Sequence, residues 1–373
     1  MSYLEKLLEG VEVEWKALGE ICIRTKGTKI TASQMKVLHK ENAPLKIFAG
    51  GKTVAFVAFD DIPERDINRE PSIIVKSRGN IEFEFYNKPF SHKNEMWSYY
   101  SKDDNTDIKF IYYFLKVHEL YFQNIASVMQ MPQISIQVTE KFKIPIPPLS
   151  VQKEIVRILD TFTELTAELT AELTAELTAR KQQYSYYREE LLSFDEGEVE
   201  WKTLGEVCIS ISSGKNKDKS ENGRYPVYGS TGIIGRTDNM AYEIKQILVA
   251  RVGANAGQVN IAMGQYDVSD NTLILKTSDE IVLKYLFYYL QNLNLNRFVR
   301  GGGQPLLTAG QLKVFEIPIP PLEEQERIVS ILDKFDTLTN SISEGLPKEI
   351  ALRQKQYEYY RDRLLTFPSL SEV

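Results

Sequence analysis

The chain has 373 residues, a length that indicates two or three domains. Its 43% hydrophobic and 11% aromatic content is typical of globular proteins with packed cores and excludes a disordered chain. The formal net charge of −6 excludes a uniformly basic protein that coats DNA. Charged residues interrupt every long apolar run, which excludes a membrane span. Because the sequence also shows no amino-terminal signal pattern, we expect a cytoplasmic protein.

The first clear motif is EVEWKALGEICI at residues 12–23, and it returns as EVEWKTLGEVCI at 198–209 with ten of twelve positions identical. Such self-similarity indicates that one scaffold occurs twice in the chain. Cys22 and Cys208 stand at matching points of this repeat, so two separate buried thiols are favoured over a disulfide. The two Cys and three scattered His show no metal-ligand spacing, so we expect no metal.

A variable block with mixed features follows the first motif. Short runs rich in β-branched and aromatic residues, bounded by Gly, Pro, Asn or Asp, predict strands at 53–58, 72–75 and 81–86. An apolar run at 108–115 predicts a helix. Loops such as KSRGN at 76–80 carry basic and amide groups that we expect to be exposed. The pattern predicts an α+β domain.

A proline corner, IPIPPL at 144–149, precedes a long helical segment. Apolar residues recur at helical spacing from Val151, and no Gly or Pro occurs before Gly197, which predicts a helix of about 40 residues and about 60 Å. Its centre holds three TAEL tetrads at 166–177, with Leu at every fourth position. This single apolar ridge needs a partner helix.

The second variable block resembles the first in its organisation. Strands are predicted at 246–250 and 271–275, and a helix at 282–290. Between Gly205 and Phe315 there are 12 Lys and Arg against 9 Asp and Glu, so this block is basic although the whole chain is acidic. A chain with this asymmetry can bind phosphates with one part and keep acidic faces elsewhere.

A second helical segment ends the chain. IPIPPL returns at 317–322, and residues 353–367 match residues 180–194 at nine of fifteen positions. We expect this segment to pair antiparallel with the first long helix as a coiled-coil-like spacer, with a kink or break at Gly345-Leu346-Pro347. The helical context of the tyrosine clusters at 184–187 and 357–360 favours core packing or partner contact over base stacking.

The order of variable and repeated blocks predicts a pseudo-twofold α+β fold, with two globular domains joined by two long antiparallel helices. LLEGVEVEW near the start echoes LLSFDEGEVEW further on, so the amino-terminus continues the carboxy-terminal repeat. We place the first globular domain at 1–146, the first spacer helix at 147–196, the second globular domain at 197–319 and the second spacer helix at 320–373.

The sequence lacks the motifs of several enzyme classes. It has no GxxxxGK[ST] phosphate loop and no Gly-rich nucleotide turn followed by an Asn/Asp-Pro-Pro-aromatic sequence. We find no convincing carboxylate–lysine nuclease cluster and no Ser/His/Asp or Cys/His set. We therefore expect no catalytic residue and no cofactor in this chain, and a binding role instead.

The remaining chemistry lies on loops and suits nucleic acid. Lys and Arg neutralise phosphates, while Arg, Asn and Gln can read base edges. Each such residue alone is more often a solvated surface side chain, but a set on the loops of two related scaffolds is a stronger signal. The candidate DNA contacts are Lys52, Lys76, Arg78, Asn80, Lys93, Asn94, Lys215, Arg236, Arg251, Asn255, Arg300 and Gln304.

These motifs together resemble those of type I restriction–modification specificity subunits. The resemblance covers nearly the whole chain and includes the IPIPPL junctions, the TAEL tetrads, YPVYGSTGIIG at 225–235 and LVARVGANAGQVNIA at 248–262. It implies two target-recognition domains, each binding one half of a split site in double-stranded DNA, and two methyltransferase subunits docked on the framework. Motor-nuclease subunits would join the methyltransferase core, and S-adenosylmethionine, ATP and Mg²⁺ would belong to those partners.

Two other functions stay open on the residues alone. A stand-alone DNA-modifying enzyme would need catalytic clusters that the sequence does not display. A purely structural coiled-coil adaptor would not bind DNA selectively and would have no use for two divergent α+β blocks.

Overall fold

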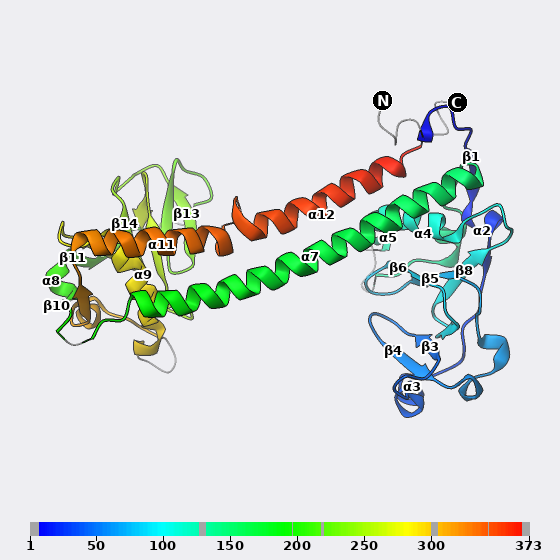
Figure 1. The fold of residues 1–373 in the computed structure, drawn as a ribbon, viewed down its shortest axis with the longest axis horizontal. Helices are drawn as coiled ribbons and strands as arrows, with labels where there is room; N and C mark the ends of the chain where they lie inside the picture. Colours follow the sequence, from blue (N-terminus) through cyan, green and yellow to red (C-terminus); the bar gives the residue numbers. More distant parts are fainter. Residues whose placement is uncertain are drawn as a thin grey trace. The chain divides into compact units, whose positions relative to one another are not determined.

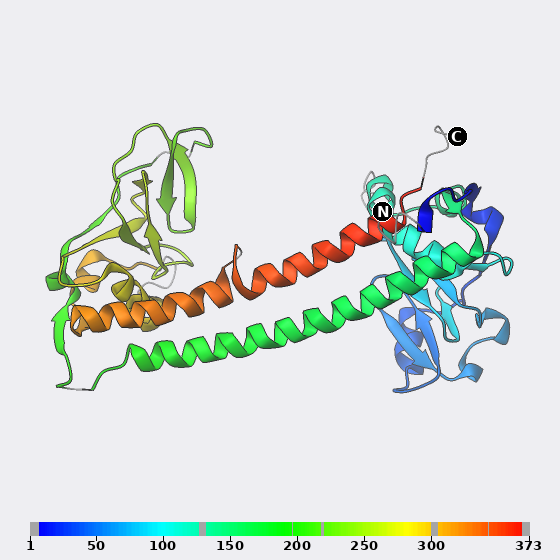
Figure 2. The same ribbon diagram turned by 45° about the horizontal axis from the view of Figure 1, so that its top comes forward.

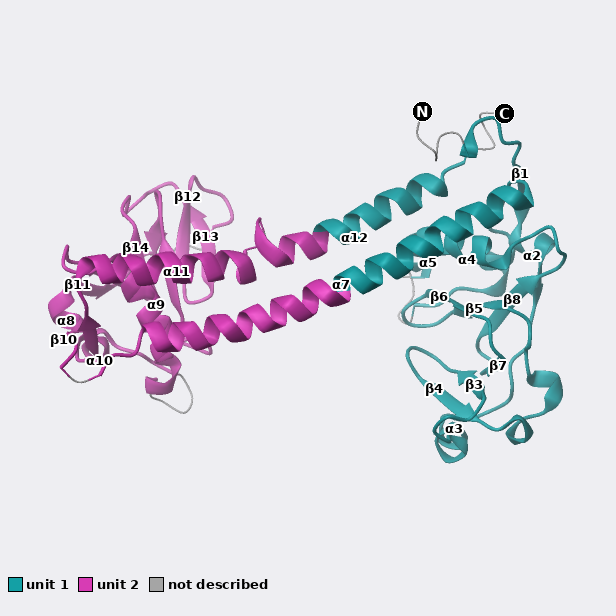
Figure 3. Ribbon diagram, in the orientation of Figure 1, with its two compact units in different colours: residues 1–170, 352–373 teal, residues 171–351 magenta. Residues whose placement is uncertain are grey.

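The structure of the chain, a computed structural model, describes residues 7–126, 132–195, 197–217, 220–299, 305–341 and 343–367. It divides into two compact units, residues 1–170 with 352–373 (unit 1) and residues 171–351 (unit 2), which Figure 3 distinguishes by colour. Each unit holds one α+β body together with parts of the long helical segments.

The α+β body of unit 1 contains an antiparallel sheet in the order β2-β8-β5-β6 and a second sheet, β4-β3-β7, in which β3 and β7 run parallel. Helix α4 packs on strands β5 and β6 of the first sheet. The elements are β1 (Glu14–Ala17), α2 (Leu18–Ile21), β2 (Cys22–Arg24), α3 (Ala32–Leu38), β3 (Leu45–Phe48), β4 (Val54–Val57), η1 (Phe59–Asp61), η2 (Glu64–Asp66), β5 (Ser72–Lys76), β6 (Glu82–Tyr86), β7 (Phe90–His92), β8 (Trp97–Ser101), α4 (Ile108–Val117), α5 (Glu119–Ala126), α6 (Ile136–Glu140) and β9 (Lys143–Ile146).

Unit 2 repeats this topology strand for strand. Its antiparallel sheet has the order β11-β17-β14-β15. In its second sheet, β13-β12-β16, strands β12 and β16 run parallel, as β3 and β7 do in unit 1. The variable blocks therefore share one fold despite their different sequences. The elements are β10 (Glu200–Thr203), α8 (Leu204–Val207), β11 (Cys208–Ser213), β12 (Tyr225–Gly229), β13 (Gly232–Thr237), β14 (Gln246–Ala250), β15 (Val259–Ala262), β16 (Asp267–Val268), β17 (Thr272–Thr277), α9 (Leu283–Leu293), η3 (Leu295–Phe298), α10 (Ala309–Lys313) and β18 (Glu316–Ile319).

The two repeated motifs of each half pair with one another. EVEWK supplies β1 and β10, while the IPI of the proline corner supplies β9 and β18. Trp15 lies opposite Pro145, and Trp201 lies opposite Pro318. Proline is tolerated here because each ribbon has only two strands, so the missing N–H costs no central ladder bond. Strands β9 and β18 were not predicted from the sequence, because IPIPP contains Pro at alternate positions, and β1 and β10 were missed because they are short and pair with strands distant in the sequence.

The first long helix is α7 (Leu149–Leu191), 43 residues without interruption (Figures 1 and 2), which confirms the predicted length. In unit 1 its partner is α12 (Gly345–Leu364), where the ring of Phe162 lies 5.7 Å from that of Tyr360 and Thr163 hydrogen-bonds Tyr357 at 3.0 Å. A later residue of α7 thus meets an earlier residue of α12, so the pair is antiparallel. The TAEL leucines at 169, 173 and 177 are half-buried.

The second helical segment is broken where Gly and Pro predicted it. Helix α11 (Leu322–Asn340) ends before the break, and α12 begins at Gly345, whose φ of 75° is a left-handed conformation suited to glycine. Pro347 falls in the first turn of α12, where its missing N–H costs nothing. The tandem helices α11 and α12 together form the second spacer segment.

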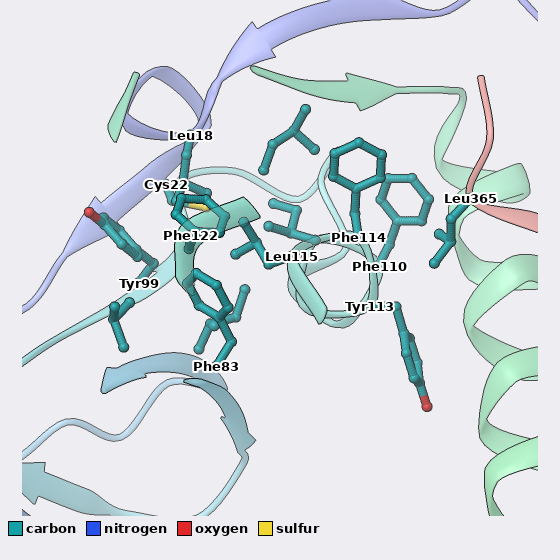
Figure 4. Close-up of a cluster of buried hydrophobic side chains, with 14 of the residues drawn as sticks. Leu18, Cys22, Phe83, Tyr99, Phe110, Tyr113, Phe114, Leu115, Phe122 and Leu365 are labelled. Atoms are coloured by element: carbon teal, nitrogen blue, oxygen red, sulfur yellow. The ribbon is translucent and has the colours of Figure 1, made fainter. Parts of the chain in front are cut away.

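Each α+β body has its own hydrophobic core, and each core includes side chains of the long helices. In unit 1 the buried cluster joins Phe110 and Phe114 of α4 to Ile155 and Leu159 of α7 and to Leu364 of α12; Figure 4 shows part of this cluster. In unit 2 Tyr184 is buried and stacks on Phe335 of α11, so the expected packing role is confirmed for Tyr184, whereas Tyr186, Tyr187 and Tyr359 are exposed. Both cysteines are buried and free, also as predicted.

Candidate nucleic-acid interface

The loops with basic and amide side chains gather at one edge of each main sheet. In unit 1 strands β2 and β5 end, and β8 begins, at the same edge, because Arg24 lies opposite Tyr99 and Val75 lies opposite Trp97. In unit 2 strands β11, β14 and β17 have the same arrangement. Antiparallel pairing brings these loops, distant in sequence, into one place in each unit.

A groove of about 820 Å³ lies at this edge in unit 1. Four basic side chains line it: Arg24, Lys26, Arg65 and Arg78. Asn94, in the turn between β7 and β8, and Trp97, at the start of β8, also line the groove. Its acidic lining residues are Asp66 and Glu95. The groove is therefore basic on balance and offers guanidinium and amide groups together, which is the chemistry that contacts phosphates and base edges.

The basic groups of this groove differ in how far they are already paired. Arg65 is largely exposed, and its nearest carboxylate oxygen, on Asp66, is 3.9 Å away. The Nε of Arg24 donates to Glu140 at 3.2 Å. Glu95 is bound by Lys93 at 2.6 Å. Burial raises the pKa of Glu95, but the hydrogen bond from Lys93, a backbone hydrogen bond and the positive charges of Lys93 and Arg78 together lower that pKa below its ordinary value, so the carboxylate stays charged at neutral pH.

A buried polar cluster supports the floor of the groove. His92 is fully buried, and its Nε2 lies 3.1 Å from Oγ1 of Thr25, which also hydrogen-bonds Ser98. Burial lowers the pKa of His92, so the ring is neutral at physiological pH. Gly27 crosses directly over it, and a Cβ at this position would lie 2.2 Å from the carbonyl oxygen of His92. Only glycine fits so close an approach.

The predicted contacts of unit 1 fall into three groups. Arg78 and Asn94 line the groove. Lys93 lies beside the groove, is half-buried and forms an ion pair with Glu95. Lys52 and Asn80 are exposed on turns outside the groove. The expectation that Lys76 is exposed is wrong: it is the last residue of β5, is buried, and binds Glu82 and Glu84 at 2.9 Å each. Its alternation along the strand points the side chain to the acidic face of β6.

In unit 2 two predicted residues lie at the equivalent sheet edge. Lys215 is exposed just after β11, and its backbone N–H donates to Val268 at 3.0 Å. Arg251 follows β14, and its Nη1 donates to the carbonyl of Asp270 at 3.3 Å. The turn before β17 thus positions the guanidinium, as the turn before β8 positions Asn94 in unit 1. The Nε of Arg251 is buried and has no hydrogen-bond partner among the described residues, so the guanidinium is only partly paired.

The other predicted residues of unit 2 have different surroundings. Arg236 is exposed on β13, but its guanidinium donates to the carbonyls of Gly223 and Arg224 at 2.7 and 2.8 Å, so two of its N–H groups brace its own loop. Asn255 lines a separate polar hollow of about 420 Å³ with Arg188 of α7. Arg300 and Gln304 lie outside the described residues.

Sequence reasoning missed three basic groups of the groove: Arg24, Lys26 and Arg65. The first two follow immediately after the repeated EICI motif, where the variable block begins. Their position at a boundary between repeated and variable sequence was the signal available. Arg65 carries no such signal, because only the fold of the η2 turn brings it to the edge of the sheet.

The described residues form neither a metal site nor a membrane span. Across the part of the chain that the structure describes, no group of three or more His, Cys, Asp and Glu side chains is placed to hold a metal ion. Among those same residues, no helix is both long and apolar enough to cross a membrane.

Comparison with known proteins gives a consistent result. The family model for the type I restriction modification DNA specificity domain matches residues 10–179 and again residues 196–352. The chain is 38% identical to the specificity subunit of the type I restriction enzyme EcoR124I/EcoR124II of Escherichia coli, covering 100% of this chain and 99% of that protein. It is 34% identical to the EcoprrI specificity subunit of Escherichia coli, covering 92% of each.

Solved structures share the fold at low sequence identity. A chain solved in work on complex assembly and conformational transition of the type I R-M system matches with a TM-score of 0.66 and 18% identity, covering 96% of this chain and 98% of that one. The S subunit from M. genitalium matches with a TM-score of 0.55 and 19% identity, covering 99% and 100%. The paired units and spacer helices are thus a known architecture.

Proposed function

Since this chain belongs to the family with the type I restriction modification DNA specificity domain, we propose that it is the sequence-specific DNA-binding subunit of a type I restriction–modification system. Each unit reads one half of a split site in double-stranded DNA. The observation that carries this proposal is the repetition of one strand topology, with matching loop-bearing sheet edges, in two blocks of different sequence. A shared scaffold with different loops suits two readers of different base sequences.

We propose a division of labour along the chain in line with the segments predicted from its sequence. Residues 1–146 and 197–319 act as target-recognition domains, and residues 147–196 and 320–373 act as spacers. In unit 1 the groove residues Arg24, Lys26, Arg65, Arg78 and Asn94 contact DNA. In unit 2 Lys215 and Arg251 do so from the equivalent edge, with Arg300 and Gln304 as further candidates. Lys52, Asn80, Lys93, Arg236 and Asn255 are secondary candidates, for phosphate contacts at the margins.

The spacers are the proposed docking surface for two methyltransferase subunits. The half-buried TAEL leucines leave apolar area uncovered, and Leu165 just before them is 55% exposed. Uncovered apolar side chains along a helix favour contact with a protein partner. Motor-nuclease subunits would join through the methyltransferase core.

We infer that the chain itself is not catalytic. Its sequence has no phosphate loop and no methyltransferase motif, and its sheet edges offer cationic and amide donors instead of a nucleophile with its base. S-adenosylmethionine, ATP and Mg²⁺ therefore belong to the partner subunits, and a DNA-modifying complex of this kind acts in the cytoplasm.

The experiment is to purify the chain alone and with its system's methyltransferase subunits, and to map methylated positions by sequencing. The proposal expects methylation at one split site with the complex, and neither methylation nor cleavage with the chain alone. Methyl transfer or cleavage by the chain alone would establish a stand-alone enzyme. Methylation without sequence preference would favour a purely structural adaptor.

A further inference from the structure

Helix α4 of the reading domain in unit 1 is fastened to the spacer helix by a carboxylate. Asp160 of α7 accepts a hydrogen bond from the Tyr113 hydroxyl at 2.6 Å and from Nζ of Lys109 at 2.7 Å. Lys109 and Tyr113 stand four residues apart on α4, so both side chains reach the same point of α7. Figure 4 shows the ring of Tyr113 with its hydroxyl pointing away from the apolar cluster.

Unit 2 contains the same arrangement. Asp333 of α11 accepts a hydrogen bond from the Tyr288 hydroxyl at 2.6 Å and pairs with Lys284, and these two residues again stand four apart, on α9. We call the two sets the clamps: Lys109–Tyr113–Asp160 and Lys284–Tyr288–Asp333. The partners come from a variable block and a repeated block, so the clamps join reader to spacer in both units.

A second attachment lies two turns earlier on each spacer helix. Gln152 is fully buried, its Nε2 donates to Pro147 at 2.7 Å, and its Oε1 accepts from the backbone N–H of Asp107 at 2.9 Å. Gln325 does the same in unit 2, and its Oε1 accepts from the N–H of Val282 at 2.7 Å. The aspartate follows the glutamine by eight residues in each unit, a separation of about 12 Å along the helix.

The tyrosine hydroxyl is the most defined part of each clamp. Burial, with the neighbouring carboxylate adding to it, raises the pKa of Tyr113 and of Tyr288, so both remain protonated donors. Both rings are buried, whereas the lysine and aspartate side chains of the two ion pairs are 31–39% exposed and solvent screens them. A short, directed bond from a buried ring fixes orientation better than a screened ion pair does.

The clamps persist where the surrounding sequence differs. Phe110 and Tyr112 of α4 correspond to Tyr285 and Phe287 of α9, so the aromatic residues beside the clamps are exchanged. The Lys and Tyr of the clamps are the same in both helices. Core packing accepts such exchanges of aromatic residues, because it depends on volume and shape. A bond that is kept while the packing varies points to a requirement for geometry.

From these contacts we propose that the clamps determine how strictly the complex discriminates the length of the unread gap between its two half-sites. With two attachments about 12 Å apart, a reader cannot rock on its spacer helix. One added base pair shifts a half-site by about 3.4 Å and about 35°, so only rigid readers can reject neighbouring gaps. Tyr113 and Tyr288 are positioning residues that contact no DNA. This inference rests on the proposed function.

The test uses the intact complex with its methyltransferase subunits and the double variant Tyr113→Phe/Tyr288→Phe, which removes only the two hydroxyls. Substrates carry both half-sites with the natural gap, or with a gap one base pair shorter or longer. Methylation of each is quantified by sequencing. Tyr121→Phe, the same change at an exposed tyrosine of α5, is the matched control. Melting temperatures are measured in parallel.

We expect the preference for the natural gap to fall by about tenfold in the double variant, because each clamp loses one hydrogen bond to a charged group, while the bases read in each half-site stay the same. Tyr121→Phe should keep the wild-type profile. A merely structural role would lower the melting temperature but leave the gap preference intact.

An unchanged gap preference in the folded double variant would overturn the proposal, and so would altered half-site bases. If the double variant does not assemble, each single variant decides by the same criterion. Failure of the proposed function is distinguishable, because the wild-type complex itself would then show no split site.

Discussion

Removing one TAEL tetrad from α7 should shorten the unread gap by about one base pair. Deleting residues 170–173 removes about 6 Å of rise and about 40° of rotation beyond a full turn. One base pair of B-DNA contributes about 3.4 Å and close to 35°, so the rotations nearly match. The remaining tetrads keep Leu at every fourth position, so the apolar ridge stays continuous.

The structure indicates that the deletion is tolerated. It removes one half-buried leucine, Leu173, whose contribution to the free energy of unfolding is about 1 kcal/mol. That is small against the roughly 5–15 kcal/mol of a folded protein. Adding a tetrad should lengthen the gap by the same amount. The assay maps methylated sites of each variant complex by sequencing.

A two-residue insertion at the same place is the control, because it turns the following helix by about 200° and should abolish methylation. Tetrad variants that still methylate, but at the wild-type gap, would show that α7 does not set the spacing.

Three further predictions concern the groove, its floor and the cysteines. In a DNA-binding titration, Arg78→Ala should weaken binding by about 1–3 kcal/mol if Arg78 reads a base, or reduce the dependence of binding on salt by about one phosphate contact if it binds phosphate. Lys88→Ala, in an exposed turn at the opposite end of the sheet, should change neither the affinity nor its salt dependence. Gly27→Ala should lower the free energy of unfolding in urea by about 1–3 kcal/mol, because the added Cβ would meet the carbonyl of His92. Gly50→Ala, with open space around it, should leave that free energy unchanged. Equal urea midpoints for the two variants would contradict the close approach. Burial raises the pKa of both cysteines to about 12, so neither thiol should react with an alkylating reagent at pH 8 until the chain is denatured. Alkylation of the native protein, detected by mass spectrometry, would contradict their burial.

Much of the fold follows from the sequence because its signals are local or repeated. The absence of Gly and Pro between Val151 and Gly197 predicted α7, and Gly345-Leu346-Pro347 predicted the break before α12. Short β-rich runs bounded by turn residues, such as β5 and β14, were also found, and both strands are buried along their whole length. Strands β1 and β9 were not, because they gain stability only from pairing with each other across about 130 residues of chain.

The candidate site was less predictable, because it depends on which loops meet. Lys76 and Arg78 are two residues apart, yet the first is buried on Glu82 and Glu84 and the second lines the groove. Composition alone cannot separate them, since Lys76 is the last residue of β5 and packs on β6, whereas Arg78 lies beyond the end of the strand, in the segment that bridges to Gln133. Arg65 joins the groove only through tertiary contacts.

Whether the two units read separate half-sites can be tested by exchanging residues 24–143 for the first variable block of another family member. Methylated sites of the wild-type and exchanged complexes are mapped by sequencing under the same conditions. If the units read separately, one half-site changes to that of the donor protein while the other half-site and the gap remain. A simultaneous change in both half-sites would contradict it.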